Sequence, residues 1–296
     1  MIQITIYIST FYFIKKITCI HSIFVLMHIL DTLEKSIGSY KYQIKDKITL
    51  EMPNEDLCRK VHRTVDYTWT IHTNVIRDSS NVTHHLTLVT HCDAGRLYKV
   101  QSLLQYWKGP MSIAMLVPSN ESAFVLNELD IMLKERSNVA VHFVINDDPT
   151  GLFYPTNMMR NIAVNGSSTK YVFLCDVDFV PVTDADVLLS KYTDTLPSKQ
   201  VLVVPAFESS SFQIDDTALL SKTDLNQHMI TSKIQQFHKD KCFQCHGATN
   251  FTKWWKADTA YDIQYTDKFE PYVVMNKSEI IPFKEYFVGR FYNKIS

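Results

Sequence analysis

Short apolar runs and amphipathic stretches alternate through the middle of the chain. Runs rich in β-branched and aromatic residues predict buried strands at Leu86–Thr90, Met111–Val117, Val139–Val144, Tyr171–Pro181 and Val201–Pro205. Between these runs, apolar residues recur at helical spacing over Leu97–Trp107, Ala123–Leu133, Asn157–Val164 and Asp184–Tyr192. Because strands alternate with helices, the sequence predicts an α/β fold with a mainly parallel sheet and helices on both faces.

The first 30 residues have a different pattern, typical of secretory targeting. Lys15 and Lys16 precede the apolar run Ile17–Leu30, which suits a signal peptide or a short signal anchor. An amphipathic core helix or a misplaced start of translation is the alternative. Five Asn-x-Ser/Thr sequons also fit a lumenal protein. Their asparagines are Asn81, Asn120, Asn165, Asn250 and Asn276.

Residues 31–84 are mixed and polar, as expected of a stem or lead-in segment. Within this range, polar and apolar residues alternate over Val65–Ile76, which predicts an edge strand. We therefore expect the regular α/β domain to occupy residues 85–296.

Two carboxylates, Asp176 and Asp178, interrupt the strand predicted at Tyr171–Pro181. In an extended chain both side chains point to the same side, and the carboxyl end of such a strand faces the ligand crevice. The two carboxylates repel each other unless a cation lies between them. Carboxylate oxygens favour Mg²⁺ or Mn²⁺, which bridge phosphates. The pair therefore predicts a divalent-metal and diphosphate site, with a solvated loop as the alternative.

The composition limits the classes of ligand that such a site could bind. A net charge of −1 gives no basic footprint for nucleic acid. The chain has only 7 Gly residues, and they form no Gly-rich phosphate loop of either common pattern. Recognition of a phosphate therefore has to rest on a metal ion and on side chains.

The 6 cysteines permit disulfides in a secretory compartment. Cys175 lies inside a predicted strand and suits a core thiol. Cys242, Cys245 and His246 match a haem-attachment pattern and half of a zinc site, but no second Cys or His pair follows at zinc spacing. A local disulfide or two free thiols is therefore the favoured interpretation.

Several sequence blocks resemble the glycosyltransferase 49 family, which includes the second catalytic domain of LARGE-type xylosyl/glucuronyltransferases and β-1,4-glucuronyltransferase 1. The blocks occur in family order within residues 85–296. They are Leu86–His91, Tyr106–Pro110, Met159–Ala163, Tyr171–Pro181, Val203–Glu208, Thr249–Trp254 and Phe269–Val274. The resemblance implies a GT-A type nucleotide-sugar-binding fold, with the Asp-x-Asp motif at a strand end.

The resemblance implies inverting transfer of glucuronic acid, or a related sugar, from a UDP-sugar to a glycan hydroxyl on a glycoprotein, as in O-mannosyl glycan extension. It also implies Mn²⁺ (or Mg²⁺) and a single-pass type II protein, held in the Golgi membrane by an N-terminal anchor with its catalytic domain in the lumen. Asp176 and Asp178 would hold the metal, and Arg160, Asn161 and Asp176 would bind the donor.

An inverting transfer also needs a general base for the acceptor hydroxyl. Glu270 is the candidate, with a structural carboxylate as the alternative. Aromatic rings stack on sugar faces, although most aromatic residues of the C-terminal half also suit a second part of the core. The residues expected to bind the acceptor are Trp254, Tyr272, Asn293 and Lys294.

Two departures from the family pattern bear on activity. Arg290, Phe291 and Tyr292 stand where the family has Phe-Gly-Trp before Asn-Lys. Family members continue beyond the position of Ser296 into a segment whose His is thought to complete the metal shell, so we expect the C-terminal part of the family domain to be missing. The alternative function is therefore that of a catalytically inactive relative that binds a glycan or a partner transferase.

Overall fold

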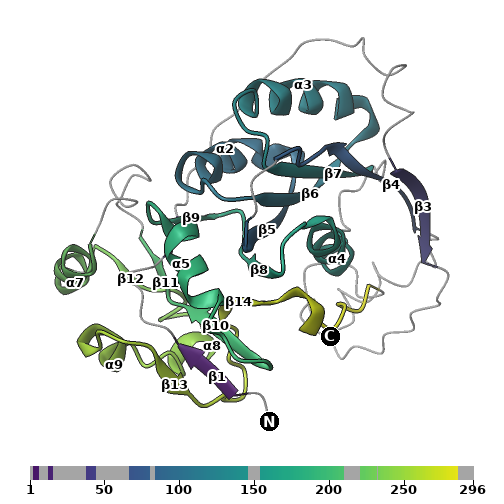
Figure 1. The fold of residues 1–296 in the computed structure, drawn as a ribbon. Coiled ribbons are helices and arrows are strands. Elements are labelled where there is room, and N and C mark those ends of the chain that lie inside the picture. Colours follow the sequence, from purple (N-terminus) through teal and green to yellow (C-terminus); the bar gives the residue numbers. More distant parts are fainter. Residues whose placement is uncertain are drawn as a thin grey trace, which may run out of the picture.

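The computed structural model describes residues 3–6, 13–15, 38–44, 67–80, 84–145, 154–209, 221–231 and 233–285. These residues form two sheets flanked by helices (Figure 1). In spatial order, the strands of the ten-stranded sheet are β13 (Tyr261–Ile263), β1 (Gln3–Ile6), β10 (Gln200–Val204), β14 (Tyr272–Asn276), β8 (Tyr171–Leu174), β5 (Leu86–Asp93), β6 (Met111–Val117), β7 (Val139–Ile145), β4 (Tyr67–Ile76) and β3 (Gly38–Ile44).

The four-stranded sheet and the helices complete the described fold. The smaller sheet contains, in order, β12 (Gln235–Gln236), β11 (Ala206–Glu208), β2 (Phe13–Lys15) and β9 (Phe179–Pro181). The α-helices are α2 (Leu97–Tyr106), α3 (Ser122–Met132), α4 (Thr156–Gly166), α5 (Ala185–Thr193), α7 (Lys222–Ile230), α8 (Phe243–Gly247) and α9 (Phe251–Lys256). Short 3₁₀ turns lie at η1 (Ala94–Arg96), η2 (Ser119–Glu121) and η3 (Lys277–Glu279).

Most strands of the large sheet run in one direction. Strands β8, β5, β6 and β7 are parallel neighbours, and β10, β1 and β3 share their direction. Strands β14, β13 and β4 run the opposite way. The sheet is therefore mixed, with mostly parallel strands, and the predicted α/β class is confirmed.

Side chains of the central strands alternate between two apolar layers. Leu88 of β5 and Ile113 of β6 are buried on the face covered by α2 and α3, in a cluster that includes Leu103 of α2. Val89 and Ala114, the next residue of each strand, are buried on the other face with residues of α4. Figure 1 shows α2 and α3 on one side of these strands and α4 on the other. Helices therefore cover both faces, as predicted.

Strand β4 forms where the sequence predicts a strand, but its position in the sheet differs from the prediction. It pairs with β7 on one side and with β3 on the other. The prediction of an edge strand was therefore wrong. Alternation of polar and apolar residues signals one buried face, and an inner antiparallel strand shows that pattern as well as an edge strand does.

Two further strands lie in the range predicted as a signal peptide or anchor. Strand β1 pairs with β10 and β13, and β2 pairs with β9 and β11. The apolar run Ile17–Leu30 lies outside the described residues, so secretory targeting stays a prediction. None of the helices in the described ranges has the length and apolar character needed to span a bilayer.

The stretch Tyr171–Pro181 forms two strands instead of one. Strand β8 belongs to the large sheet and β9 to the small one, and a turn joins them. In this turn the Phe179 amide donates to the Asp176 carbonyl at 3.1 Å. Buried Val177 lies between exposed Asp176 and partly buried Asp178. The carboxylate pair therefore stands at a strand end, as predicted, but a turn and not strand alternation directs its side chains.

A buried hydrogen-bond network joins β4, β6, β7 and α4. The Asn74 amide donates to His142 Nδ1 at 3.0 Å, so the neutral imidazole carries its proton on Nε2. His142 Nε2 lies 3.3 Å from Ser112 Oγ, which donates to the Ala163 carbonyl at 2.6 Å. His142 and Ser112 are 1% and 0% exposed. Burial lowers the pKa of His142 to about 4, so the ring stays neutral in the folded protein.

We expect acid to destabilise the fold through His142. Its pKa is about 4 when folded and 6.5 ordinarily, so between these values the unfolded chain binds more protons than the folded chain. The contribution of neutral His142 to the free energy of unfolding is complete above the pKa of the unfolded chain. As the pH falls toward the pKa of the folded protein, the free energy of unfolding drops by on the order of 3 kcal/mol.

Urea unfolding at about pH 7.5 and about pH 4.5 measures this loss. His142→Asn is the matched comparison, because asparagine can still accept from the Asn74 amide but has no titratable ring. We expect the variant to lose part of the pH dependence. The same pH dependence in both proteins would show that His142 has no such role.

Candidate active site

The carboxyl ends of β5 and β8 bring the candidate site together. The two strands are parallel neighbours, with Val89 paired to Leu174. The Cys175 amide continues the pairing by donating to the Val89 carbonyl at 3.1 Å. Beyond this point, the last residues of β5 run beside the turn that carries the two aspartates. This is the sheet edge at which ligands bind in open α/β folds.

Asp176 is held by a tyrosine from the neighbouring antiparallel strand. Strand β14 begins at Tyr272 and pairs with β8 so that Val273 lies opposite Leu174. The Tyr272 hydroxyl donates to Asp176 Oδ2 at 2.8 Å. Burial, reinforced by the Asp176 carboxylate, raises the pKa of Tyr272 well above its ordinary value. The phenol therefore stays protonated and keeps its hydrogen bond to Asp176.

Two cations face Asp178, one from η1 and one from the first turn of α2, the elements that follow β5 in the chain. Arg96 Nη1 donates to Asp178 Oδ2 at 3.2 Å, and Arg96 Nε lies 3.6 Å from Asp93 Oδ2. Lys99 Nζ lies 4.0 Å from Asp178 Oδ1, and the Lys99 side chain is buried in the first turn of α2. The turn thus combines carboxylates with basic groups, a combination that can bind both a cation and an anion.

A third basic group, Arg160 of α4, lies within electrostatic range of Asp176. Burial lowers the pKa of Arg160, and the charge of Asp176 is the strongest influence in the opposite direction. His91 Nδ1 lies 2.8 Å from the Tyr154 hydroxyl. Burial and the Arg160 cation lower the pKa of His91 to about 4. His91 is therefore a neutral hydrogen-bonding group at neutral pH, and Arg160 is the charged one.

The sequence predicts that Asn161 contacts the sugar donor, whereas the structure shows its side chain bonded to protein groups. Its Nδ2 donates to the Phe283 carbonyl at 2.8 Å and to Glu285 Oε1 at 2.7 Å. Its Oδ1 accepts from the Phe283 amide at 2.9 Å. The Arg160 guanidinium lies 5.3 Å from the centre of the Phe283 ring. Asn161 therefore holds the segment that supports Arg160, and its amide groups are already engaged with protein partners.

Glu270 lies within electrostatic reach of this cluster. Its charge is among those that raise the pKa of Arg160 against the dominant effect of burial. The Glu270 side chain is exposed, and its backbone amide donates to the Cys245 carbonyl at 2.8 Å. This bond fixes the loop, so Glu270 is held within electrostatic range of Arg160 with its side chain exposed to solvent.

Of the remaining predicted acceptor residues, Trp254 lies in the core. Trp254 is 0% exposed and packs against Phe207, with ring centres 5.5 Å apart. The prediction that Trp254 contacts the acceptor was wrong, because the core encloses its ring. Asn293 and Lys294 lie outside the described residues, so their acceptor role stays a prediction.

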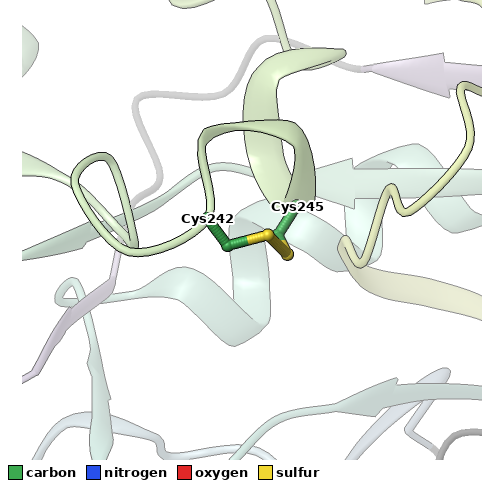
Figure 2. The surroundings of a disulfide bond; sticks show 2 residues. All are labelled: Cys242 and Cys245. Carbon is green, nitrogen blue, oxygen red and sulfur yellow. A yellow bond between two sulfur atoms is a disulfide. The ribbon is translucent and has the colours of Figure 1, made fainter.

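Cys242 and Cys245 form a disulfide, which confirms one of the two favoured interpretations of this motif (Figure 2). The bridge closes the turn that leads into α8. The next residue, His246, is buried, and its ring lies nearly parallel to Tyr272, with centres 6.0 Å apart and planes 15° apart. The disulfide-bonded turn therefore packs against the tyrosine that holds Asp176.

The chemistry of the Asp176–Asp178 pair fits a hard divalent cation. Both groups offer carboxylate oxygens, the ligands that Mn²⁺ and Mg²⁺ favour, and both lie outside the core on either side of buried Val177. Within the ranges that the structure describes, no group of three or more His, Cys, Asp or Glu side chains is arranged to hold a metal ion. The pair therefore supplies only part of a coordination shell.

Sequence reasoning missed four side chains of this cluster: His91, Arg96, Lys99 and Tyr154. One signal was available, because Arg96 and Lys99 follow a predicted strand end with a spacing that places them on one side of a helical turn. The contact between His91 and Tyr154 joins residues 63 positions apart. No local pattern indicates such a contact.

Comparisons with known proteins identify relatives over most of the chain. The family model described as "Glycosyl-transferase for dystroglycan" (glycosyltransferase family 49) matches residues 85–151 and 146–296. Xylosyl- and glucuronyltransferase LARGE2s of Danio rerio is 33% identical over 216 residues, 71% of this chain and 28% of that protein. LARGE1 of Homo sapiens is 31% identical over 258 residues, 83% of this chain and 33% of that protein.

The chain belongs to the glycosyltransferase 49 family. It spans about a third of the length of the curated relatives that it matches. A solved structure, S. aureus TarS 1-349, aligns with 38% of this chain and 32% of its own at 14% identity with a TM-score of 0.25, an overlap too small to bear on the fold.

Proposed function

We propose that this chain transfers glucuronic acid, or a related sugar, from a UDP-sugar to a glycan hydroxyl with inversion at the anomeric carbon. The relatives LARGE1 and LARGE2s are named xylosyl- and glucuronyltransferases. The observation that carries the proposal is the Asp176–Asp178 turn at the carboxyl edge of the sheet, where Arg96 and Arg160 also lie. A site for a UDP-sugar needs carboxylates that bind a cation and guanidinium groups that bind phosphate oxygens.

The proposed reaction assigns a proton acceptor and an anion-binding group to residues of this chain. The acceptor oxygen bonds to the anomeric carbon as the bond from that carbon to UDP breaks, and UDP leaves with the electron pair. Glu270 accepts the hydroxyl proton as the general base. Arg160, beside Asp176, binds the diphosphate or the carboxylate of the sugar through its planar fork.

Asp176 and Asp178 would hold Mn²⁺ or Mg²⁺. When bound, the cation would neutralise negative charge on the diphosphate and on the departing UDP. The Tyr272 hydroxyl fixes the Asp176 carboxylate through its hydrogen bond of 2.8 Å. Tyr272 thus positions a metal-binding oxygen, and the proposal keeps its aromatic ring as a contact of the acceptor sugar.

The proposal includes a lumenal location in the Golgi, with an anchor at Ile17–Leu30. Strands β1 and β2 precede this run and pair with strands of the domain, so they lie on the same side of the membrane as the domain and the run would enter the membrane without crossing it. The sequons support this location, because the side chains of Asn120 and Asn165 are exposed and accessible to glycosylation. Membrane extraction of the full chain tests the anchor. A protein released from membranes by alkaline carbonate would contradict it.

We expect removal of divalent cations to lower UDP release by at least about 10²-fold, because the charge on departing UDP is then poorly stabilised. The full chain is incubated with UDP-glucuronate and methyl xyloside, an acceptor suggested by the names of the relatives. Activity with Mn²⁺, with EDTA, and with EDTA followed by excess Mn²⁺ is compared. Equal UDP release with Mn²⁺ and with EDTA would refute the metal-dependent reaction.

The alternative is a catalytically inactive relative that binds a glycan or a partner transferase. It predicts no UDP release with either Mn²⁺ or Mg²⁺, and an unchanged result for variants of Asp176 and Asp178. The geometry favours the enzyme, because an inactive binding protein has no need of a carboxylate pair among three basic side chains.

A further inference from the structure

A cavity of about 490 Å³ lies next to α8. Residues of α8, α9 and β13 contribute to its lining, together with Gln236 of β12. Its volume falls within the range of about 300–1,000 Å³ that is usual for small-molecule sites. The reaction proposed above does not use this cavity.

Helix α8 separates the cavity from the carboxylate site. Phe243 and Gly247 of this helix line the cavity. From the same short helix, the Cys245 carbonyl accepts from the Glu270 amide, and the His246 ring lies parallel to the ring of Tyr272. One layer of protein therefore separates the cavity from the proposed base and from the tyrosine that holds Asp176.

The lining combines aromatic rings with uncharged polar groups. Phe243 is 63% exposed, and Tyr261 presents a second ring. Gln264 contributes an amide that can donate and accept hydrogen bonds, and Asn250, whose Oδ1 already accepts from the Lys253 amide at 3.0 Å, contributes its Nδ2 as a donor. Proteins bind a sugar with aromatic rings, which stack on its C–H faces, and with amides, which form hydrogen bonds with its hydroxyl groups.

Charge at the cavity is balanced. Among the described residues that line it, Lys253 is the cation and Asp262 is the carboxylate. A site built for a phosphate or a metal ion would carry an excess of one sign. The balance therefore favours a neutral, hydroxyl-rich ligand.

The walls of the cavity are held in place before any ligand binds. The Tyr261 hydroxyl donates to the Thr249 carbonyl at 2.7 Å, and Lys253 Nζ lies 4.2 Å from the centre of the Tyr261 ring. The disulfide in Figure 2 closes the turn that carries Phe243. A fixed aromatic surface binds a sugar at a lower entropic cost than a mobile one does.

We infer that this cavity is an acceptor subsite, which binds sugar units of the glycan away from the hydroxyl that reacts. This inference rests on the proposed function, since it assigns the cavity to the same acceptor. It predicts that an acceptor of several sugars binds better than a single sugar, because only the longer chain reaches past α8. The test therefore measures binding separately from transfer.

Xylotetraose and methyl xyloside serve as probes, measured by calorimetry and by saturation-transfer NMR. We expect Phe243→Ala to weaken xylotetraose binding about tenfold, since a stacking ring is lost, and to leave methyl xyloside binding unchanged. Phe124→Ala, which removes an exposed ring of α3, is the matched control and should bind xylotetraose normally. Phe243 is exposed, so its removal leaves the core intact.

Asp178→Asn separates the two proposals. It should abolish transfer and keep xylotetraose binding. If transfer is absent from the unaltered chain while binding depends on Phe243, the proposed function fails and the subsite stands. Failure of xylotetraose to bind, or equal binding by Phe243→Ala, overturns the subsite. A glycan attached to Asn250 would also overturn it, because this side chain lines the cavity.

Discussion

Replacement of Asp178 by asparagine is expected to lower sugar transfer by at least about 10²-fold. The change keeps the shape of the side chain and removes one of the two carboxylates that would hold the metal on the diphosphate. It also removes one of the two anionic partners of the Arg96 guanidinium, 3.2 Å away, and leaves Asp93 as the other. UDP release and transfer to methyl xyloside, both measured with saturating Mn²⁺, report the loss.

The loss should come from the site and not from unfolding. The Asp178 side chain is 18% exposed and that of Arg96 is 49% exposed, so their ion pair contributes at most about 1 kcal/mol to stability. Asp130→Asn changes an exposed carboxylate of α3 and is the matched control for the removal of one charge. Activity of Asp178→Asn equal to that of Asp130→Asn would remove Asp178 from the mechanism.

Replacement of Gly166 by alanine is expected to destabilise the fold by about 3 kcal/mol or more. Gly166 is the last residue of α4, and a Cβ there would overlap His142 Nε2 and Cε1 and lie 2.8 Å from Ser112 Oγ. Both neighbours are buried and hydrogen-bonded, so neither can move without breaking the network. Helix propensity alone predicts the opposite sign, a gain of about 1 kcal/mol for alanine in a helix.

Urea unfolding at neutral pH distinguishes the two signs. Gly95→Ala is the comparison, because its Cβ would meet only Asp93 Oδ1, at 3.1 Å, in an exposed turn. We expect Gly95→Ala to change the free energy of unfolding by less than about 1 kcal/mol. A Gly166→Ala protein as stable as the unaltered chain would mean that the close packing of α4 against His142 is wrong.

The sequence predicts much of the central sheet because apolar periodicity is a local signal. Met111–Val117 forms a strand with the predicted bounds, and Asn157–Val164 lies within α4. The carboxylate pair was also predictable, since two aspartates that interrupt an apolar run stand out without any knowledge of the fold. Periodicity carries no information on neighbours in the sheet, which is why the inner position of β4 was missed.

Residue roles were less predictable, because one residue type suits several environments. An aromatic ring suits a sugar face and a core equally well, and the fold decides between them. Trp254 is enclosed, whereas Tyr272 reaches Asp176. Asn161 lies on the expected helix, but its partners are about 120 positions away along the chain. Such long-range contacts leave no local pattern.

The central claim is that the turn carrying Asp176 and Asp178 serves glucuronyl transfer to a glycan hydroxyl. Mass spectrometry of the acceptor tests this most directly, after the full chain has been incubated with UDP-glucuronate, Mn²⁺ and either methyl xyloside or xylotetraose. We predict an acceptor that has gained one glucuronosyl unit, formed by the unaltered chain at least about 10²-fold faster than by Asp178→Asn. An unmodified acceptor with the unaltered chain, or product formed at the same rate by Asp178→Asn, would contradict the claim.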